Sequence, residues 1–350
     1  MSDAYAAAGV DTDRSDAAVG AIVGVLGGID TGSPSRVVPL PGHYASVLRV
    51  SDELGIAIAT DGVGSKLVLA EQTGRLDTVG IDCIAMNVND LVCVGAEPIA
   101  LVDYLAVEQA DPQATEAIAR GLAVGAADAG IEIPGGELAV LPELIRGHPS
   151  PHGFDLCGTA IGTVALDAIL TGDEISPGDA LIGVPSSGLH SNGYTLARRA
   201  LVDEGPGLDA TPEELGGASV ADALLAPTVI YVRAALDLMR SGVAVQGLSH
   251  ITGGGLKNLL RLGSGVGYAI EDPLPVPPIC TLVARFGDVP ESEMWEVFNM
   301  GCGFVAIVPE DGVEEATAIL GARHPGARRI GTVTDAAGVA TAPGGVALRA

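Results

Sequence analysis

Lys66 stands in a glycine-rich segment whose residue types could bind phosphate. The segment from Ile58 to Lys66 reads Ile-Ala-Thr-Asp-Gly-Val-Gly-Ser-Lys, and Lys66 is one of only two lysines in the 350-residue chain. Small residues after an apolar strand let backbone N–H groups approach an anion closely. Lys66 would add a point charge for phosphate, and Asp61 could hold a Mg²⁺ that bridges phosphate oxygens. A strand-to-helix turn with an exposed surface lysine is the alternative interpretation.

A second set of polar residues lies in a predicted helix at 81–94. Asn87 and Asp90 are three residues apart on one stripe of this helix, and Asn89 lies on a neighbouring stripe. Burying such groups unpaired costs about 1–3 kcal/mol each. A hard cation with oxygen ligands would satisfy Asp90 and its neighbours. A solvated polar face is the alternative, but the apolar residues between these positions favour a site.

Two further carboxylates have settings that suggest a role. Glu137 follows Gly135 and Gly136, which allow a backbone conformation that directs a carboxylate into a cleft. Asp103 lies within an apolar stretch that is predicted to be a buried strand, where a carboxylate is either a ligand or the partner of an arginine. Together with Asp61 and Asp90 they could supply the carboxylates of a Mg–nucleotide site.

Two hydroxyl- and glycine-rich segments in the second half could bind an anion at the start of a helix. The first includes Ser187, His190, Ser191 and Asn192; the second is Ser249–Gly255, with Thr252, Gly253 and Gly254. His190 could donate a hydrogen bond or act as an acid or base near neutral pH. A structural role for a histidine in a turn is equally compatible with the sequence.

These residues must be positioned by more than one folding unit, because 350 residues exceed the size of one ordinary core. Turn-forming residues at 167–180 interrupt the pattern, so we expect an N-terminal domain at 1–168 and a C-terminal domain at 174–345. Both halves mix strands and helices, which predicts two α/β (α+β) domains. The expected strands are 44–51, 54–60, 99–107, 156–166, 180–185 and 303–308, and the expected helices are 17–26, 81–94, 113–129, 192–203, 227–241, 254–262 and 312–321.

Charge and cysteine content narrow the classes of partner and compartment. The formal net charge is −26, which argues against nucleic acid and anionic membranes and requires a local cationic pocket for a phosphate substrate. The acidic residues are scattered, as on the solvated surface of a protein that works in high salt. Five cysteines without zinc spacing predict reduced thiols in the cytoplasm. The sequence contains no recognisable signal peptide or 18-residue apolar run.

Several motifs together resemble one enzyme family, that of phosphoribosylformylglycinamidine cyclo-ligase, also called aminoimidazole ribonucleotide synthetase. The motifs occur in the family's order at Tyr5–Asp11, Thr60–Lys66, Asp82–Leu91 with Gly95–Pro98, Pro134–Glu137, Ser187–Tyr194, Ala226–Tyr231, His250–Gly255 and Phe298–Gly303. The match spans nearly the whole chain, and an ordered set of motifs is far more specific than any single one.

The resemblance implies ATP-dependent cyclisation of formylglycinamidine ribonucleotide to 5-aminoimidazole ribonucleotide, with Mg²⁺, in a cytoplasmic homodimer whose N-terminal sheets pair. It implies catalytic roles for Lys66, His190 and Asp61, and metal binding by Asp61, Asp90 and Glu137. The implied nucleotide- and substrate-binding residues are Gly62, Gly64, Ser65, Asn87, Asn89, Asp103, Gly135, Gly136, Ser187, Ser191, Asn192, Thr252, Gly253 and Gly254.

The sequence departs from the family pattern in two places. Residues 37–43 lack the family's usual glycine-rich loop, and Val140 replaces an acidic residue three positions after Glu137. The alternatives are therefore another ATP-using enzyme of the same superfamily, of the hydrogenase-maturation dehydratase, selenophosphate synthetase or thiamine-phosphate kinase type, or an inactive nucleotide-binding homologue. The earliest cysteine, Cys83, and the terminus at Ala350 do not match the reactive cysteines of the first two types.

Overall fold

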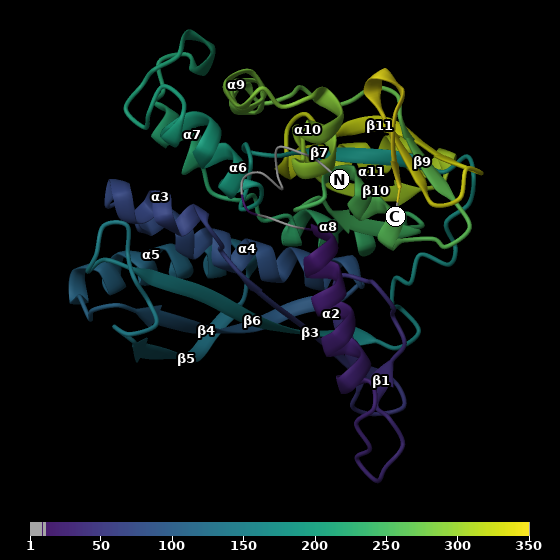
Figure 1. Cartoon of the computed structure of the whole chain (residues 1–350). Coiled ribbons are helices and arrows are strands. Elements are labelled where there is room, and N and C mark those ends of the chain that lie inside the picture. Colours follow the sequence, from purple (N-terminus) through teal and green to yellow (C-terminus); the bar gives the residue numbers. More distant parts are fainter. Residues whose placement is uncertain (1–8, 10–11, 350) are drawn as a thin grey trace.

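The computed structural model describes Gly9 and residues 12–349, so the motif Tyr5–Asp11 lies outside the described residues except for Gly9. The described chain forms two sheets, one in each half of the sequence, and α4 lies between the first sheet and the second half of the molecule (Figure 1). Each half mixes strands and helices, which confirms the predicted fold class.

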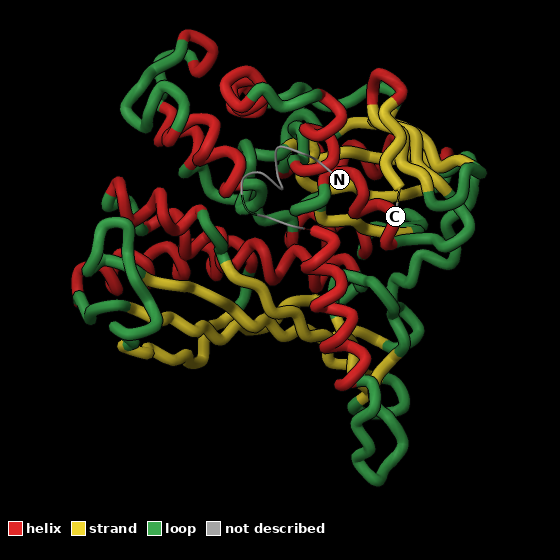
Figure 2. Tube along the Cα trace, in the orientation of Figure 1, coloured by secondary structure: helices red, strands yellow, loops and turns green. Residues whose placement is uncertain are grey.

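The N-terminal half is a sheet covered on one face. The sheet order is β1-β2-β3-β6-β4-β5, antiparallel except for the β4–β5 pair. Helices α4 and α5 lie on its upper face in Figure 1, and Figure 2 shows no described helix packed against the lower face. The strands are β1 (Val37–Val38), β2 (Ser46–Arg49), β3 (Leu54–Gly62), β4 (Glu97–Val107), β5 (Glu132–Val140) and β6 (Phe154–Ala165), and the helices are α2 (Thr12–Leu26), α3 (Lys66–Thr73), α4 (Asp77–Cys93) and α5 (Pro112–Ala129).

The two covering helices approach each other closely through paired glycines. A Cβ at Gly80 of α4 would lie 2.2 Å from the backbone nitrogen of Leu122, and a Cβ at Gly121 of α5 would lie 2.0 Å from the carbonyl oxygen of Asp77. Any side chain there would force the helices apart. This contact holds α4, which carries the polar residues of interest, firmly against its neighbour.

The C-terminal half is built on a second sheet with the order β13-β12-β9-β11-β7-β10-β8. Its strands are β7 (Ala180–Pro185), β8 (Gly247–His250), β9 (Gly267–Ile270), β10 (Cys302–Val308), β11 (Arg328–Thr334), β12 (Val339–Ala342) and β13 (Val346–Arg349). Its longer helices are α6 (Tyr194–Arg198), α7 (Val220–Leu224), α8 (Val232–Met239), α9 (Pro278–Gly287), α10 (Glu291–Val297) and α11 (Val313–Arg323). Every residue of β10 is buried, as its continuous apolar sequence predicts.

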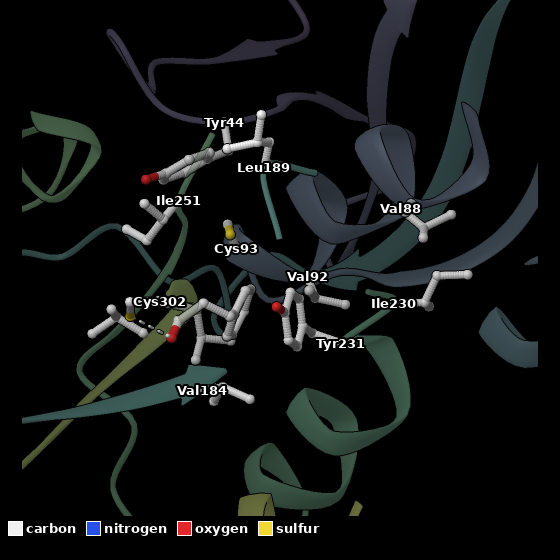
Figure 3. Close-up of a cluster of buried hydrophobic side chains, with 14 of the residues drawn as sticks. Tyr44, Val88, Val92, Cys93, Val184, Leu189, Ile230, Tyr231, Ile251 and Cys302 are labelled. Carbon is white, nitrogen blue, oxygen red and sulfur yellow. Dashed lines mark hydrogen bonds between the residues drawn. The ribbon is translucent and has the colours of Figure 1, made fainter. Parts of the chain in front are cut away.

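Buried apolar side chains from both halves form a common core. Figure 3 shows Val88 and Val92 of α4 beside Ile230, Tyr231 and other side chains of the C-terminal half. The two halves are therefore joined by apolar packing in addition to the polar contacts described below.

The expected elements occur with local differences. The helix expected at 227–241 begins only at Val232, and α7, α9, α10, β8, β9, β11, β12 and β13 were not expected. Residues 254–262 form a 3₁₀ segment, η3 (Gly255–Arg261), instead of an α-helix, and 192–203 divides into α6 and a π-type turn at Arg199–Asp203. Strand β5 was not expected, because its Pro-Gly-Gly sequence resembles a turn. In the described part of the chain no helix is both long and apolar enough to cross a bilayer.

Candidate active site

Sheet register places Asp61 and Asp103 on the face covered by α4. Both residues are paired with Gly158 of the central strand β6, one from each side, and Asp103 is also paired with Gly136. Residues directly opposite in a sheet point to the same face. A Cβ at Gly158 would lie 2.9 Å from the Asn87 side-chain nitrogen, so the glycine permits α4 to pack directly on this row.

Asp61 and Asp90 form the acidic centre of the site. Burial raises the pKa of Asp61, a hydrogen bond from the Gly62 N–H lowers it, and the nearby charge of Asp90 raises it again. Asp90 in turn lies 2.9 Å from Nδ1 of the buried His250. Two interacting carboxylates at a domain boundary are suited to a divalent cation, because Mg²⁺ is commonly held by one or two carboxylates plus phosphate oxygens.

Three polar atoms near this centre are buried without a partner. They are Oδ1 of Asn87, Nδ1 of His190 and Nδ2 of Asn192. Asn87 is held by donating to the carbonyl oxygens of Asp61 and Cys83, at 3.2 and 2.9 Å, so its free oxygen is fixed in place. Buried polar atoms are seldom left unpaired in native proteins. Asn87 and Asn192, expected as binding residues, thus offer an acceptor and a donor to a ligand.

His190 is held in a strained and fully buried turn. Its φ is 61°, and its Nε2 accepts a hydrogen bond from the Ser187 N–H at 3.3 Å. Desolvation lowers the pKa of His190 well below its usual value, and electrostatic interactions with His250 and Lys66 lower it further. The ring is therefore neutral near pH 7 and can exchange hydrogen bonds at Nδ1.

Lys66 fits neither the predicted phosphate-binding position nor the alternative of an exposed surface lysine. Its ammonium is fully buried and lies 2.8 Å from the Asp82 carboxylate. It also donates to the carbonyl oxygens of His190 and Ala226, at 3.1 and 2.7 Å. These three partners use all three N–H donors of the lysine. In this structure Lys66 ties α3 and α4 to the C-terminal half, and no donor remains for phosphate.

Asn89 is likewise committed to the contact between the halves. Its side-chain nitrogen donates to the Val229 carbonyl oxygen at 2.9 Å, and its side-chain oxygen accepts from the Tyr231 N–H at 2.9 Å. With both groups occupied, Asn89 positions the segment 226–231 and is not open to a nucleotide. A polar residue in a helix could equally bind a ligand or a neighbouring backbone, and the sequence did not distinguish them.

Glu137 is not part of the acidic centre. In β5 it is paired with Tyr104, one residue beyond the Gly136–Asp103 pair, so alternation directs it away from that row. Among the described residues, no group of three or more His, Cys, Asp or Glu side chains is arranged to hold a metal ion. The expected ligand set of Asp61, Asp90 and Glu137 is therefore not assembled in one chain.

The remaining expected residues line or support the boundary between the halves. Ser65 Oγ lies 3.3 Å from Thr195 Oγ1, Ser191 Oγ lies 3.0 Å from Thr228 Oγ1, and Ser187 Oγ donates to the Pro227 carbonyl oxygen. The Thr252 N–H donates to Asn258. Gly62 ends β3, Gly64, Gly253 and Gly254 lie in turns, and Gly135 lies within β5. A Cβ at Gly253 would lie 3.1 Å from Asn192 Oδ1.

Sequence analysis assigned no role to three residues that matter here. Asp82 neutralises Lys66 and accepts from the N–H and hydroxyl of Thr228 at 2.7 Å each. His250 partners Asp90, and Tyr44 donates to the Asn258 carbonyl oxygen. Asp82 and His250 stand within the family motifs, so their position in those motifs could have identified them. Tyr44 follows the unusual loop 37–43, and no sequence pattern pointed to it.

Comparison with known protein families assigns both halves of the chain. Residues 42–164 match the model of the AIR synthase related protein, N-terminal domain, and residues 176–342 match that of the C-terminal domain. The chain is 50% identical over 335 residues to phosphoribosylformylglycinamidine cyclo-ligase of Methanothermobacter thermautotrophicus, covering 95% of this chain and 94% of that protein. It is 48% identical to the same enzyme of Thermococcus kodakarensis, covering 98% and 99%.

Solved structures share the fold at lower sequence identity. Thiamine monophosphate kinase from Aquifex aeolicus superposes with a TM-score of 0.62 at 14% identity, covering 95% of this chain and 97% of that one. Hydrogenase maturation protein HypE in complex with ATP gives a TM-score of 0.59 at 19% identity, covering 89% of each chain. These likenesses establish the fold, and the relatives above establish the family.

Proposed function

The chain belongs to the phosphoribosylformylglycinamidine cyclo-ligase family, and on that premise we propose that it closes the imidazole ring of 5-aminoimidazole ribonucleotide from formylglycinamidine ribonucleotide and ATP. Relatives that are 40–50% identical over nearly the whole chain favour this activity over those of the more distant superfamily members. The structural observation that supports it best is the Asp61–Asp90 pair together with the unpaired side-chain oxygen of Asn87, whose nitrogen donates to the Asp61 carbonyl oxygen.

The proposed reaction has two steps. The formyl oxygen of the substrate attacks the γ-phosphorus of ATP, and ADP leaves. The amidine-derived nitrogen then attacks the activated carbon, phosphate leaves, and loss of a proton completes the ring. Phosphoryl transfer requires positioning and charge neutralisation more than covalent catalysis by the protein. A site with few nucleophiles and many fixed hydrogen-bonding groups is consistent with that requirement.

We assign Asp61 and Asp90 as the residues that would hold Mg²⁺, with the free oxygen of Asn87 as a neutral ligand beside them. The metal would offset negative charge on the transferring phosphate. His190, neutral at physiological pH, and Asn192 would hydrogen-bond the reacting amide and amidine groups. Asp103 and Gly136 lie further along the same sheet row, whereas Gly135, which is paired with Val102, faces the other side of the sheet. Lys66 acts through His190, because its ammonium holds the His190 carbonyl oxygen, and is a positioning residue.

The decisive experiment measures ADP and aminoimidazole ribonucleotide after mixing the purified protein with ATP, MgCl₂ and formylglycinamidine ribonucleotide. Equal amounts of both products support the proposal. ATP hydrolysis without ring closure, or phosphorylation of another substrate, would reject it.

Asp90→Asn should weaken Mg-dependent ATP binding, because it removes a charged oxygen ligand while keeping the shape of the side chain. We expect at least a tenfold loss of affinity by titration calorimetry, consistent with about 1.5–3 kcal/mol for a charged contact. Asp237→Asn is the control, since Asp237 forms an exposed ion pair with Arg323. Equal affinity in the wild type and Asp90→Asn would remove Asp90 from the metal site.

We further propose that the protein is a cytoplasmic homodimer. The face of the N-terminal sheet opposite α4 exposes Ile99, Val102 and Tyr104 by 47%, 39% and 43%. These large apolar residues are exposed on a face of the sheet that lies away from helices α4 and α5 (Figure 1). Contiguous exposed apolar surface of this kind marks an interaction site. A cytoplasmic location is consistent with the five free cysteines.

A further inference from the structure

We propose that Arg261 binds a phosphate group of the reactants at the entrance to the Asp61–Asp90 centre. The inference rests on the proposed function, because it assigns the cation that a phosphate-handling site requires. In a chain of net charge −26, that cation must be supplied locally. Lys66, the residue expected to supply it, has its charge neutralised by Asp82 and its donors occupied.

Arg261 lies at the end of η3 with its guanidinium stacked on the ring of Tyr44, 4.9 Å from the ring centroid. Tyr44 is itself buried and fixed, because its hydroxyl donates to the Asn258 carbonyl oxygen and contacts Ser249. In the described part of the chain, Arg261 has no hydrogen-bond acceptor or ion-pair partner. The guanidinium is thus oriented by stacking while its five N–H donors remain available.

Most arginines of the C-terminal half are paired, although Arg198 and Arg349, like Arg261, have no side-chain hydrogen bond or ion pair with a described residue. Arg240 and Arg323 donate to carboxylates, and Arg233 donates to two backbone carbonyl oxygens. The acidic excess of the chain offers many possible partners, and Arg261 has none of them. A planar guanidinium held on an aromatic face and left unpaired is suited to bidentate binding of phosphate.

The location of Arg261 connects it to the acidic centre. Burial raises the pKa of Asp61, and Arg261 is among the positive charges that lower it. Arg261 also lines a pocket of about 380 Å³ with Pro41, Gly42, Lys257 and Ser264. Lys257, the second lysine of the chain, lies one turn before Arg261 and forms an ion pair with Glu296. The pocket therefore contains one free and one paired cation. Its link to the acidic centre runs through Tyr44, whose hydroxyl contacts Ser249, the chain neighbour of the His250 that is paired with Asp90.

Two sources of phosphate fit this chemistry: the ribose 5′-phosphate of the substrate and the phosphates of ATP. Substrate kinetics distinguish them. Arg261→Gln should raise the KM of one reactant about tenfold to a hundredfold, the loss expected for a charged hydrogen bond. A change confined to formylglycinamidine ribonucleotide indicates the 5′-phosphate, and a change confined to ATP indicates the nucleotide. Arg261→Lys should recover part of the loss, because lysine restores the positive charge but not the paired N–H donors of the guanidinium.

The matched control is Arg285→Gln. Arg285 also stacks on an aromatic ring, that of Phe286 at 4.8 Å, but it is paired with Glu214 on the surface of the molecule. The inference would be overturned if neither Arg261→Gln nor Arg285→Gln changed the KM of either reactant. Equal effects of both variants would also overturn it, because they would reflect net charge alone.

A binding measurement separates this inference from the proposed activity. The rise in melting temperature caused by inorganic pyrophosphate, by ATP and by formylglycinamidine ribonucleotide is compared between the wild type and Arg261→Gln. If the wild type shows no ring closure but phosphate compounds stabilise it more than they stabilise Arg261→Gln, the phosphate site stands and the proposed function fails. If none of these compounds distinguishes the two proteins, the phosphate site is rejected, whether or not the wild type is active.

Discussion

The boundary between the two halves and the outer face of the N-terminal sheet differ in which side chains they bury and which they expose. At the boundary, charged and amide groups such as Lys66, Asp82 and Asn89 are buried and paired across the halves. On the outer face, Val102 and Tyr104 are exposed and apolar, and none of the described helices or strands covers them. Polar groups are paired within the chain at the first surface, whereas apolar side chains remain exposed at the second.

The difference indicates which groups are free to function. Residues that join the halves have no capacity left for a ligand, however reactive their type. The unpaired atoms of Asn87, His190 and Asn192, and the free guanidinium of Arg261, remain available beside them. The proposed function is therefore assigned to the polar groups that the boundary holds in position but leaves without a hydrogen-bond partner.

The largest effect should come from breaking the buried ion pair. Lys66→Ala leaves the Asp82 carboxylate buried without its cation, and removing one partner of a buried pair costs about 3–5 kcal/mol. We expect the melting temperature and the urea midpoint to fall markedly, together with activity. The double variant Lys66→Met/Asp82→Leu should recover much of the stability, because no charge is left unpaired. Wild-type stability of Lys66→Ala would show that the pair does not join the halves.

Lys66 also shows where sequence reasoning succeeds and where it stops. Alternating small residues in β3 and the apolar period of α4 predicted both elements, and the ordered motifs predicted the family. The same motifs marked Lys66, but the sequence does not record that Asp82, His190 and Ala226 converge on its ammonium. Distant residues meet only through the packing of α3, α4 and the C-terminal half. β5 was missed because its glycines conceal a strand that is stabilised by pairing with β4.

A substitution on the outer face of the N-terminal sheet should have a smaller effect on folding but a large effect on dimer formation. Val102→Asp places a charge in the proposed dimer contact, and desolvating an unpaired carboxylate disfavours association. We expect sedimentation velocity to show a dimer for the wild type and a monomer for the variant. Val124→Asp is the matched control, since Val124 is exposed on α5, on the other side of the sheet. Dissociation by both variants, or by neither, would contradict the assigned face.

The histidines of the boundary give a third, pH-dependent effect. Burial lowers the pKa of His190 well below 6.5, and burial lowers the pKa of His43 to about 4. Below pH 6.5 the two imidazoles bind protons in the unfolded chain but stay unprotonated in the folded state. Stability is therefore fully present above about pH 6.5 and declines on acidification toward pH 4, by at most about 1.4 kcal/mol per pH unit for each residue.

Urea midpoints at pH 7.5, 6.5 and 5.5 measure this slope. His43→Gln should flatten it, because glutamine does not titrate. The raised pKa of Asp61 acts with the opposite sign, since a carboxyl that retains its proton in the folded state favours folding as the pH falls. A slope that is unchanged by His43→Gln would exclude His43 as a contributor.

The smallest effect expected is that of salt, and it separates surface charge from the buried boundary. The excess of acidic residues should destabilise the compact state by self-repulsion, and salt screens exposed charges over about 10 Å at 0.1 M and about 3 Å at 1 M. Exposed pairs such as Arg120–Glu116 also weaken, but each contributes only about 0–1 kcal/mol. The Lys66–Asp82 pair, with no exposed surface, is screened far less.

Melting temperature should therefore rise as KCl increases from dilute to molar, and Lys66→Ala should show the same rise from a lower starting value. A melting temperature that stays flat or falls with KCl would reject adaptation to high salt, and it would leave the cyclo-ligase family assignment unaffected.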